Sequence, residues 1–449
     1  MSQTEDIELT HGSSGVSNLN RHVHLEDEQL EDEEYYPDGG VKAYFVIVGS
    51  FLGLVVNFGI INSIGAIQAY VSTHQLVSLK ASSIAWIFSI YLSLAYATGL
   101  FVGPLFDRHG PLPLLVSSAC LIFIGLMFTA ISTKVYQFIC SFILLGIGNG
   151  LGMTPLIGVI SHWFKKKRGN CTGMATSGGS VGGLVFPLML RHSYTTYGFA
   201  WAIRIFAFTC LGFMILSIIL VKGRIKREPI HSDQQFDSRW DKIRSSLNLE
   251  KLKLNDAKYN YVVAGSFFTE LALVLLLTYY ATYAIAQGVS ESNSLLLLTV
   301  WNGLGVLGRW VPSYASDYLG HFNIMLIMLI IYSASIMIIW LPFGHHTKVL
   351  FGFAVLGGFC QGAISSLMPA CLSQITPANE IGYKFGILNS FMSIANLFGI
   401  PLASIVIGSG EVHQYNNFVI LTGMISITGT VFWYCSRFAI VGSKLNTKI

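Results

Sequence analysis

The sequence has 449 residues, of which 53% are hydrophobic and 11% are charged, with a net charge of +4 and a mean hydropathy of +0.59. Charged residues are about half as frequent as in soluble domains, which excludes an ordinary soluble globular protein. The densest basic cluster, KKKR at 165–168, is four residues long and flanked by apolar runs, which excludes nucleic-acid binding.

Residues 1–42 form an acidic segment, for which we expect a disordered cytosolic tail. Apolar runs of about 20 residues follow, the length of a membrane-spanning helix. They fall near 43–70, 84–105, 111–131, 136–162, 170–190, 200–222, 259–286, 292–316, 322–342, 347–374, 384–407 and 414–438. Runs of this length do not alternate as lipid-facing barrel strands do, so the sequence predicts an all-α membrane protein with twelve transmembrane helices.

The basic residues predict the orientation. Of 27 Lys and Arg residues, 21 fall in segments on one side of the predicted helices and four on the other, while Arg204 and Arg309 lie within apolar runs. The positive-inside rule then places both termini, the basic linker 223–258 and the tail 439–449 in the cytosol.

Internal repeats divide the chain into two similar halves of six helices, residues 43–222 and 259–438. The spacing around Asp107 in GPLFDRHG recurs around Asp317 in SYASDYLG, at an offset of 210. GIGNG at 146–150 is similar to GFCQG at 358–362, which pairs Asn149 with Gln361. Two pseudo-symmetric halves with a site between them are typical of alternating-access transporters.

Several stretches resemble the major facilitator superfamily, beginning with Gly103-x-x-x-Asp107-Arg108-x-Gly110. PDGGVKAY at 37–44 and HWFKKKRGNCTGMATSGGSVGG at 162–183 are similar to signatures of its monocarboxylate transporter family. GIINSIGAIQAYV at 59–71, GRWVPSYASDYLG at 308–320 and residues 366–391 resemble the fungal branch, the monocarboxylate transporter homologues.

The resemblance implies a fold of two six-helix halves and a role for Asp107, Arg108 and Asp317 in closing a cytosolic gate. One fungal relative transports riboflavin, so riboflavin-like and monocarboxylate-like cargoes both follow from it. The plasma membrane is the implied location, with the vacuolar membrane as the alternative. Asn62 and Gly305 stand where the animal proton-coupled members have a lysine and an aspartate, which argues against their type of proton coupling.

Ionisable residues within apolar runs are candidates for function because burying a charge in lipid is costly. Arg309 is predicted to contact substrate or to form an ion pair within the second half. Glu270 is predicted to pair with Arg309 or to bind and release a proton during transport; the alternative is a neutral buried acid that bonds a neighbouring helix. Uncharged polar residues in these runs are predicted to contact substrate or a neighbouring helix: Asn62, Asn149, Asn302, Gln361 and Asn389.

We therefore expect a secondary transporter that moves a small organic solute and works as a monomer in the bilayer. Transport is either coupled to protons or driven by the gradient of the solute alone. The sequence has no HExxH or GxxxxGK[ST] motif, so we expect no enzyme activity, no ATP, no metal and no cofactor. A nutrient sensor built on a transporter scaffold is the alternative.

Overall fold

A computed structural model describes residues 36–77, 81–224, 256–378, 380–408, 411–442 and 447. The chain from Asp38 onward forms one compact unit. Most of the expected tail at 1–42 and of the expected linker at 223–258 lies outside the described residues.

The first group of helices, called the N-half, runs from Val41 to Leu220. Glycine sets two of its boundaries: Gly110, with φ of 75°, separates α4 from the proline that begins α5, and Gly198, with φ of 73°, interrupts α8. The helices are α2 (Val41–Thr73), α3 (Ala81–Ala97), α4 (Gly99–His109), α5 (Pro111–Ile131), α6 (Val135–Gly158), α7 (Ile160–Trp163) and α8 (Arg168–Leu220).

The second group, called the C-half, runs from Ala257 to Val441. Gly320, with φ of 97°, separates two of its helices as Gly110 does in the N-half, at the same offset of 210 as the aspartates. The helices are α10 (Ala257–Ala286), α11 (Glu291–Leu319), α12 (His321–Ala334), the π-helix η2 (Ser335–Trp340), α13 (Leu341–Phe343), α14 (Thr347–Gln374), α15 (Ile381–Ile407) and α16 (Val412–Val441).

Ten helices among the described residues are long and apolar enough to cross a membrane. The 53 residues of α8 would extend about 80 Å as one rod, so its two parts on either side of Gly198 account for two crossings. The polar α11 has 29 residues, enough to span the bilayer, although it falls outside the ten. With these two additions the structure confirms the all-helical membrane architecture expected from twelve apolar runs.

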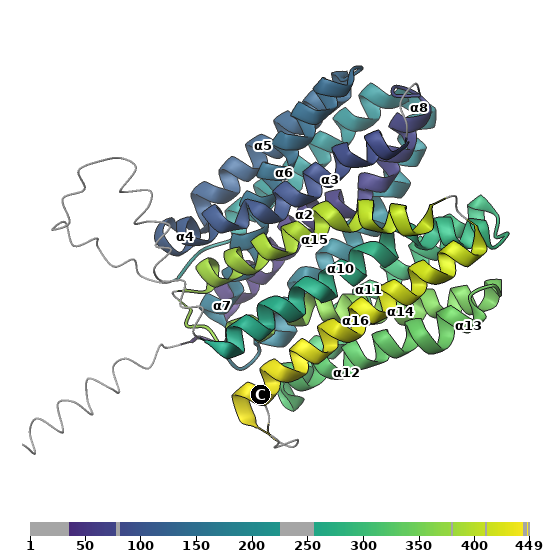
Figure 1. The fold of residues 1–449 in the computed structure, drawn as a ribbon. Helices are drawn as coiled ribbons and strands as arrows, with labels where there is room; N and C mark the ends of the chain where they lie inside the picture. The colour runs from purple at the N-terminus through teal and green to yellow at the C-terminus, as the bar shows by residue number, and fades with distance from the viewer. Residues whose placement is uncertain are drawn as a thin grey trace, which may run out of the picture. The chain divides into compact units, whose positions relative to one another are not determined.

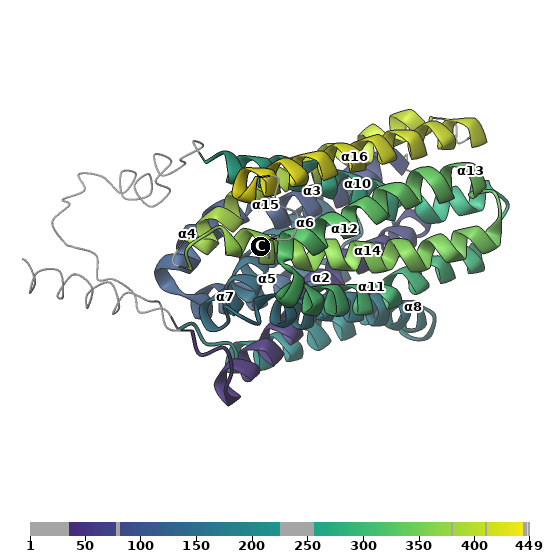
Figure 2. The ribbon, with the colours of Figure 1, turned by 90° about the horizontal axis from the view of Figure 1, so that it is seen from below.

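Figures 1 and 2 show the long helices running side by side. Within the N-half α2 packs along α8, and within the C-half α10 packs along α16 and α11 along α14. The halves meet at two places: α8 packs against α11 and α14, and α15 packs against α3, α4 and α6. At each place one helix of one half therefore packs against neighbouring helices of the other half.

An aromatic cluster at η2 anchors the C-half. Trp340 is fully buried, with ring centroids of Tyr283 and Phe353 at 5.1 Å and of Tyr280 at 5.6 Å. Close-packed aromatic rings of this kind fill volume that smaller side chains leave empty.

We expect Trp340→Ala to lower the free energy of unfolding by about 3–5 kcal/mol, because it opens a cavity among the rings. The measurement is the melting temperature of the purified protein in detergent. Trp86→Ala is the matched control, since Trp86 lies in α3 and is 43% exposed. Equal melting temperatures for both variants would contradict a role for the cluster.

Candidate functional site

Asp107 joins the end of α4 to the start of α15. Its carboxylate accepts hydrogen bonds from the backbone N–H of Gly382 at 3.0 Å and of Tyr383 at 2.7 Å. The first N–H groups of a helix have no partner within the helix, and the helix dipole favours an anion there. Asp107, from the N-half, thus caps a helix of the C-half. We call this contact the Asp107 joint.

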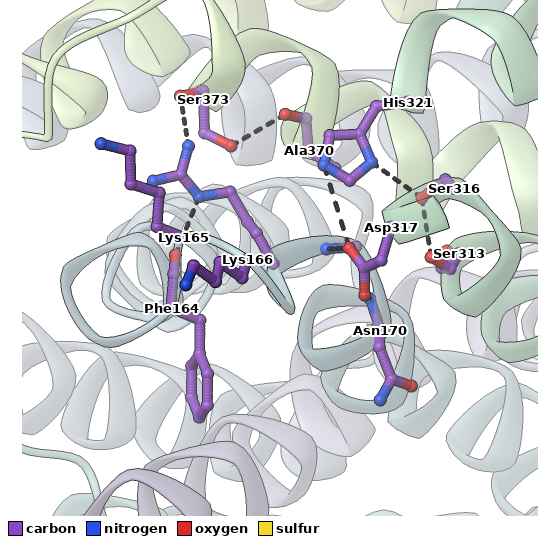
Figure 3. Close-up of polar contacts among 12 residues, drawn as sticks. Phe164, Lys165, Lys166, Asn170, Ser313, Ser316, Asp317, His321, Ala370 and Ser373 are labelled. Carbon is purple, nitrogen blue, oxygen red and sulfur yellow. Dashed lines mark hydrogen bonds and ion pairs between the residues drawn. The ribbon is translucent and has the colours of Figure 1, made fainter. Parts of the chain in front are cut away.

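Asp317 makes the reciprocal contact from the end of α11. Its Oδ1 accepts from Gly169 N at 2.8 Å and its Oδ2 from Asn170 N at 2.9 Å, in the first turn of α8 (Figure 3). This contact, the Asp317 joint, repeats the Asp107 joint with the halves exchanged. Gly169 and Gly382 correspond at an offset of 213, so the repeat found in the sequence is also a repeat of contacts.

Glycine makes both joints possible. A Cβ on Gly382 would lie 2.5 Å from Asp107 Oδ1, and one on Gly169 would lie 2.8 Å from Asp317 Oδ1. Both distances are below ordinary van der Waals contact, so any side chain would push the carboxylate away from the helix end. The glycines here serve close approach between the halves.

Two further bonds between the halves lie at the same end of the bundle. Arg168 is buried, and its guanidinium donates to Phe164 O of its own half and to Ser373 O of the C-half. Trp310 Nε1 donates to Asn170 Oδ1 at 3.0 Å. Arg108 lies beside Asp107 in the last turn of α4. The sequence placed Arg168 in a basic cluster and did not predict its contact with the C-half.

Asp38 organises the loop before α8 within the N-half. Its Oδ1 accepts from the backbone N–H of Lys165 at 2.7 Å and of Lys166 at 2.8 Å. The segment preceding α2 therefore fixes the basic loop that leads into Arg168, the first residue of α8. The Asp317 joint begins at the next residue of α8, Gly169.

Arg309 lies deeper along α11, about 12 Å from Asp317 by helical rise. Its side chain is 7% exposed, its Nε donates to Ser180 Oγ at 2.9 Å, and its guanidinium carbon lies 5.2 Å from the centre of the Phe58 ring. Ser180 and Phe58 belong to α8 and α2 of the N-half. Arg309 Nη1 is buried without a hydrogen-bond partner, so the guanidinium has a donor to spare for another group.

Glu270 lies near the middle of α10 and is held from both halves. Asn396 Nδ2 of α15 donates to its Oε1 at 3.5 Å, and the hydroxyl of Tyr96 in α3 donates to its carboxyl group. Arg309 interacts with it electrostatically, without forming a salt bridge. Glu270, Arg309, Tyr96, Ser180 and Phe58 form one group of side chains between the halves, which we call the central cluster.

Two of the predicted polar residues bind within their own half. Asn149 Nδ2 donates to the hydroxyl of Tyr91 at 3.1 Å, and Gln361 Oε1 accepts from Trp301 Nε1. Both bonds join neighbouring helices, α3 to α6 and α11 to α14. The structure therefore places Asn149 and Gln361 as equivalent links between helices, one in each half.

The other three predicted residues have different surroundings. Asn62 Nδ2 donates to Gly179 O of α8 at 3.3 Å, whereas Asn302 Nδ2 donates to Leu298 O of its own helix. Asn389 is buried with no partner for its Oδ1 and lies against Gly99, at the contact of α15 with the N-half. Of the three, Asn389 lies at the interface between the halves.

The chain was also compared with known proteins. The family model of the Major Facilitator Superfamily matches residues 46–342 and 311–446. The chain belongs to the Major Facilitator Superfamily. It is 37% identical to the riboflavin transporter MCH5 of Saccharomyces cerevisiae over 430 residues, covering 93% of this chain and 82% of the relative. It is 31% identical to the MFS-type transporter opdF of Penicillium oxalicum, covering 92% of this chain and 94% of the relative.

Solved structures agree with this fold. The human organic anion transporter MFSD10 aligns with a TM-score of 0.69 at 12% identity over 88% of this chain and all of that chain. The proton:xylose symporter XylE aligns with a TM-score of 0.65 at 15% identity over 87% of this chain and 95% of that chain. With its fungal relatives, this establishes the protein as a membrane-embedded secondary transporter of a small organic solute.

We expect Asp317→Asn and Asp107→Asn each to open the end of the bundle that carries these residues. Hydrogen bonds to a charged group contribute about 1.5–3 kcal/mol, and asparagine offers one acceptor oxygen where aspartate offers two. The measurement is maleimide labelling of Cys171, which is 2% exposed and follows Asn170 directly. Labelling should accelerate about tenfold or more.

This labelling needs a background in which the other six cysteines are replaced: Cys120, Cys140, Cys210, Cys360, Cys371 and Cys435. Asp256→Asn is the matched control, because Asp256 caps α10 of its own half through Lys258 N at 3.1 Å. Faster labelling in this control, or unchanged labelling in the two joint variants, would show that the joints do not hold the halves together.

Proposed function

We propose that this protein carries riboflavin or a similar planar organic solute across a fungal plasma membrane by alternating access. The observation that carries the proposal is Arg309, a buried guanidinium between the halves with an unpartnered Nη1 beside the ring of Phe58. A flat donor next to an aromatic ring suits a planar solute that carries carbonyl acceptors.

The similarity to a riboflavin transporter over 93% of this chain supports that choice of cargo. A carboxylate would also suit Arg309, since a guanidinium binds carboxylates through two parallel hydrogen bonds. Monocarboxylates are therefore the second candidate cargo, in keeping with the resemblance of PDGGVKAY and residues 162–183 to monocarboxylate transporters.

Alternating access follows from the joints. Both join the halves at one end of the bundle, and the central cluster joins them about 12 Å deeper. We propose that this end faces the cytosol, because Lys165, Lys166, Arg168 and Lys384 gather there. Breaking Asp107 and Asp317 away from the helix ends then opens the central cluster to the cytosol, and the carrier works as a monomer.

We expect Arg309→Lys to reduce uptake of labelled riboflavin by at least about tenfold, since lysine lacks the planar fork through which a guanidinium bonds Ser180 by Nε and presents Nη1 to a planar solute. The assay uses fungal cells that lack their own riboflavin carrier. Arg204→Lys is the matched control, because Arg204 also lies over an aromatic ring, that of Trp201 at 4.9 Å, but belongs to the last part of α8. Equal losses in both variants would remove Arg309 from the substrate site.

Lactate and pyruvate in the same cells test the second cargo. The proposed cargo would become a monocarboxylate if the cells took up either acid but not riboflavin, and if Arg309→Lys abolished that uptake. Binding of riboflavin without net flux would instead make the protein a sensor and would contradict the proposal of a carrier.

Glu270 is the proposed proton-coupling group, because it is the carboxyl of the central cluster and touches both halves through Asn396 and Tyr96. We expect Glu270→Gln to remove the dependence of uptake on external pH and on a protonophore while the protein still reaches the membrane. An unchanged rate together with an unchanged pH profile in this variant would assign Glu270 a structural role.

A further inference from the structure

The two joints differ at one neighbouring position. Asp317 is followed four residues later by His321, the first residue of α12, whereas the equivalent position after Asp107 is Pro111, the first residue of α5. The offset of 210 relates both pairs. At this position one joint therefore has a titratable side chain, and the other has a proline that cannot change charge.

The hydrogen bonds of Ser316 define the tautomer of His321 (Figure 3). Ser316 Oγ lies 2.6 Å from Ser313 O, a carbonyl that only accepts, so the serine hydroxyl donates there. His321 Nδ1 lies 2.8 Å from the same Ser316 Oγ and must then supply the hydrogen of that bond. A neutral imidazole with its hydrogen on Nδ1 turns a lone pair at Nε2 toward its other neighbour.

That other neighbour is Asp317, whose Oδ1 lies 4.0 Å from His321 Nε2 (Figure 3). The same Oδ1 accepts from Gly169 N of α8. While His321 is neutral, its Nε2 lone pair has nothing to donate to the carboxylate. Once His321 is protonated, Nε2 gains a hydrogen and a share of positive charge, so the ring competes with the N-terminus of α8 for one oxygen.

The positive charges at the start of α8 also repel a protonated His321. Lys167 and Arg168 lie at the start of α8, next to the positive end of its dipole. On α16, Arg437 Nε donates to Asn323 Oδ1 at 2.7 Å, two residues after His321. Asp317 of α11 is the neighbouring carboxylate, and Ser373 and Ala370 of α14 are uncharged. A protonated His321 is therefore attracted to Asp317 and repelled by α8, which weakens the Asp317 joint.

We propose that His321 is a positioning residue of the Asp317 joint, whose protonation draws the Asp317 carboxylate away from α8 and favours separation of the halves at this end. The Asp107 joint has no such group at the equivalent position and stays independent of it. This inference rests on the proposed alternating access but not on the identity of the cargo. It predicts that acidification on the side of the joints promotes opening toward that side.

The test is the distance between spin labels at Lys166 of the N-half and Leu319 of the C-half, both exposed and flanking the Asp317 joint. The labels are introduced into a cysteine-free protein, which is measured without substrate at about pH 8 and about pH 5.5, the range over which histidine ordinarily changes charge. Acidification should raise the ratio of the long-distance to the short-distance population by roughly two- to fivefold, the effect of a weak ion pair between side chains that are 10% and 7% exposed.

Three variants complete the design. His321→Gln should abolish the response to pH, Asp317→Asn should give the long distance at both pH values, and His413→Gln, at an exposed histidine in the first turn of α16, should leave the response intact. A pH response that persists in His321→Gln, or that disappears in His413→Gln, would overturn the role of His321. A short distance in Asp317→Asn at both pH values would overturn the gate itself and with it the proposed alternating access. A melting temperature for His321→Gln near that of the parent protein confirms that the variant is folded.

Discussion

The structure depends on two helix N-termini whose free backbone N–H groups are satisfied by aspartates from the opposite half. Those of α15 are capped by Asp107 and those of α8 by Asp317. A helix start within a bundle must find acceptors, and an anion is the acceptor that the helix dipole favours most. Each half supplies the acceptor that the other half lacks. The N–H groups at these two helix ends therefore gain their aspartate acceptors only when the halves meet.

The same symmetry fails in the central cluster, and we propose that this failure sets the chemistry of the carrier. A Cβ on Gly386 would touch Gly99 O, and one on Gly173 would touch Arg309 O, so the backbones approach equally closely on both sides. Positions 99 and 309 are equivalent at the offset of 210, yet one is glycine and the other arginine. At these two positions the duplicated scaffold therefore carries a guanidinium on one side only, and we propose that this asymmetry gives a bound solute a fixed orientation.

The sequence predicted the scaffold better than the site. The length of an apolar run is a local property, and the helices follow from it. The repeat identified Asp107 and Asp317 as equivalent positions, but it did not reveal their partners at the starts of α15 and α8. The partners of Arg309 and Glu270 come from helices more than 100 residues away, such as Ser180 and Tyr96, and no spacing within one run reveals them. Asn149 and Gln361 were candidates for substrate contact, but each binds a neighbouring helix. The sequence cannot separate these two roles, because a polar residue in an apolar run looks the same in both.

The joints and the central cluster differ in what can replace their contacts when the halves separate. Asp107 and Asp317 lie at helix ends, where water can hydrate a released carboxylate, so breaking a joint has a modest net cost. Arg309 and Glu270 lie about two turns or more from those ends, where a charge without a partner is far more costly. The joints can therefore open and close by hydration alone, whereas the central cluster must exchange Ser180 and Tyr96 for another partner. We propose that a solute, water or a proton that enters with the opening meets that need, which would link movement of the halves to the presence of cargo.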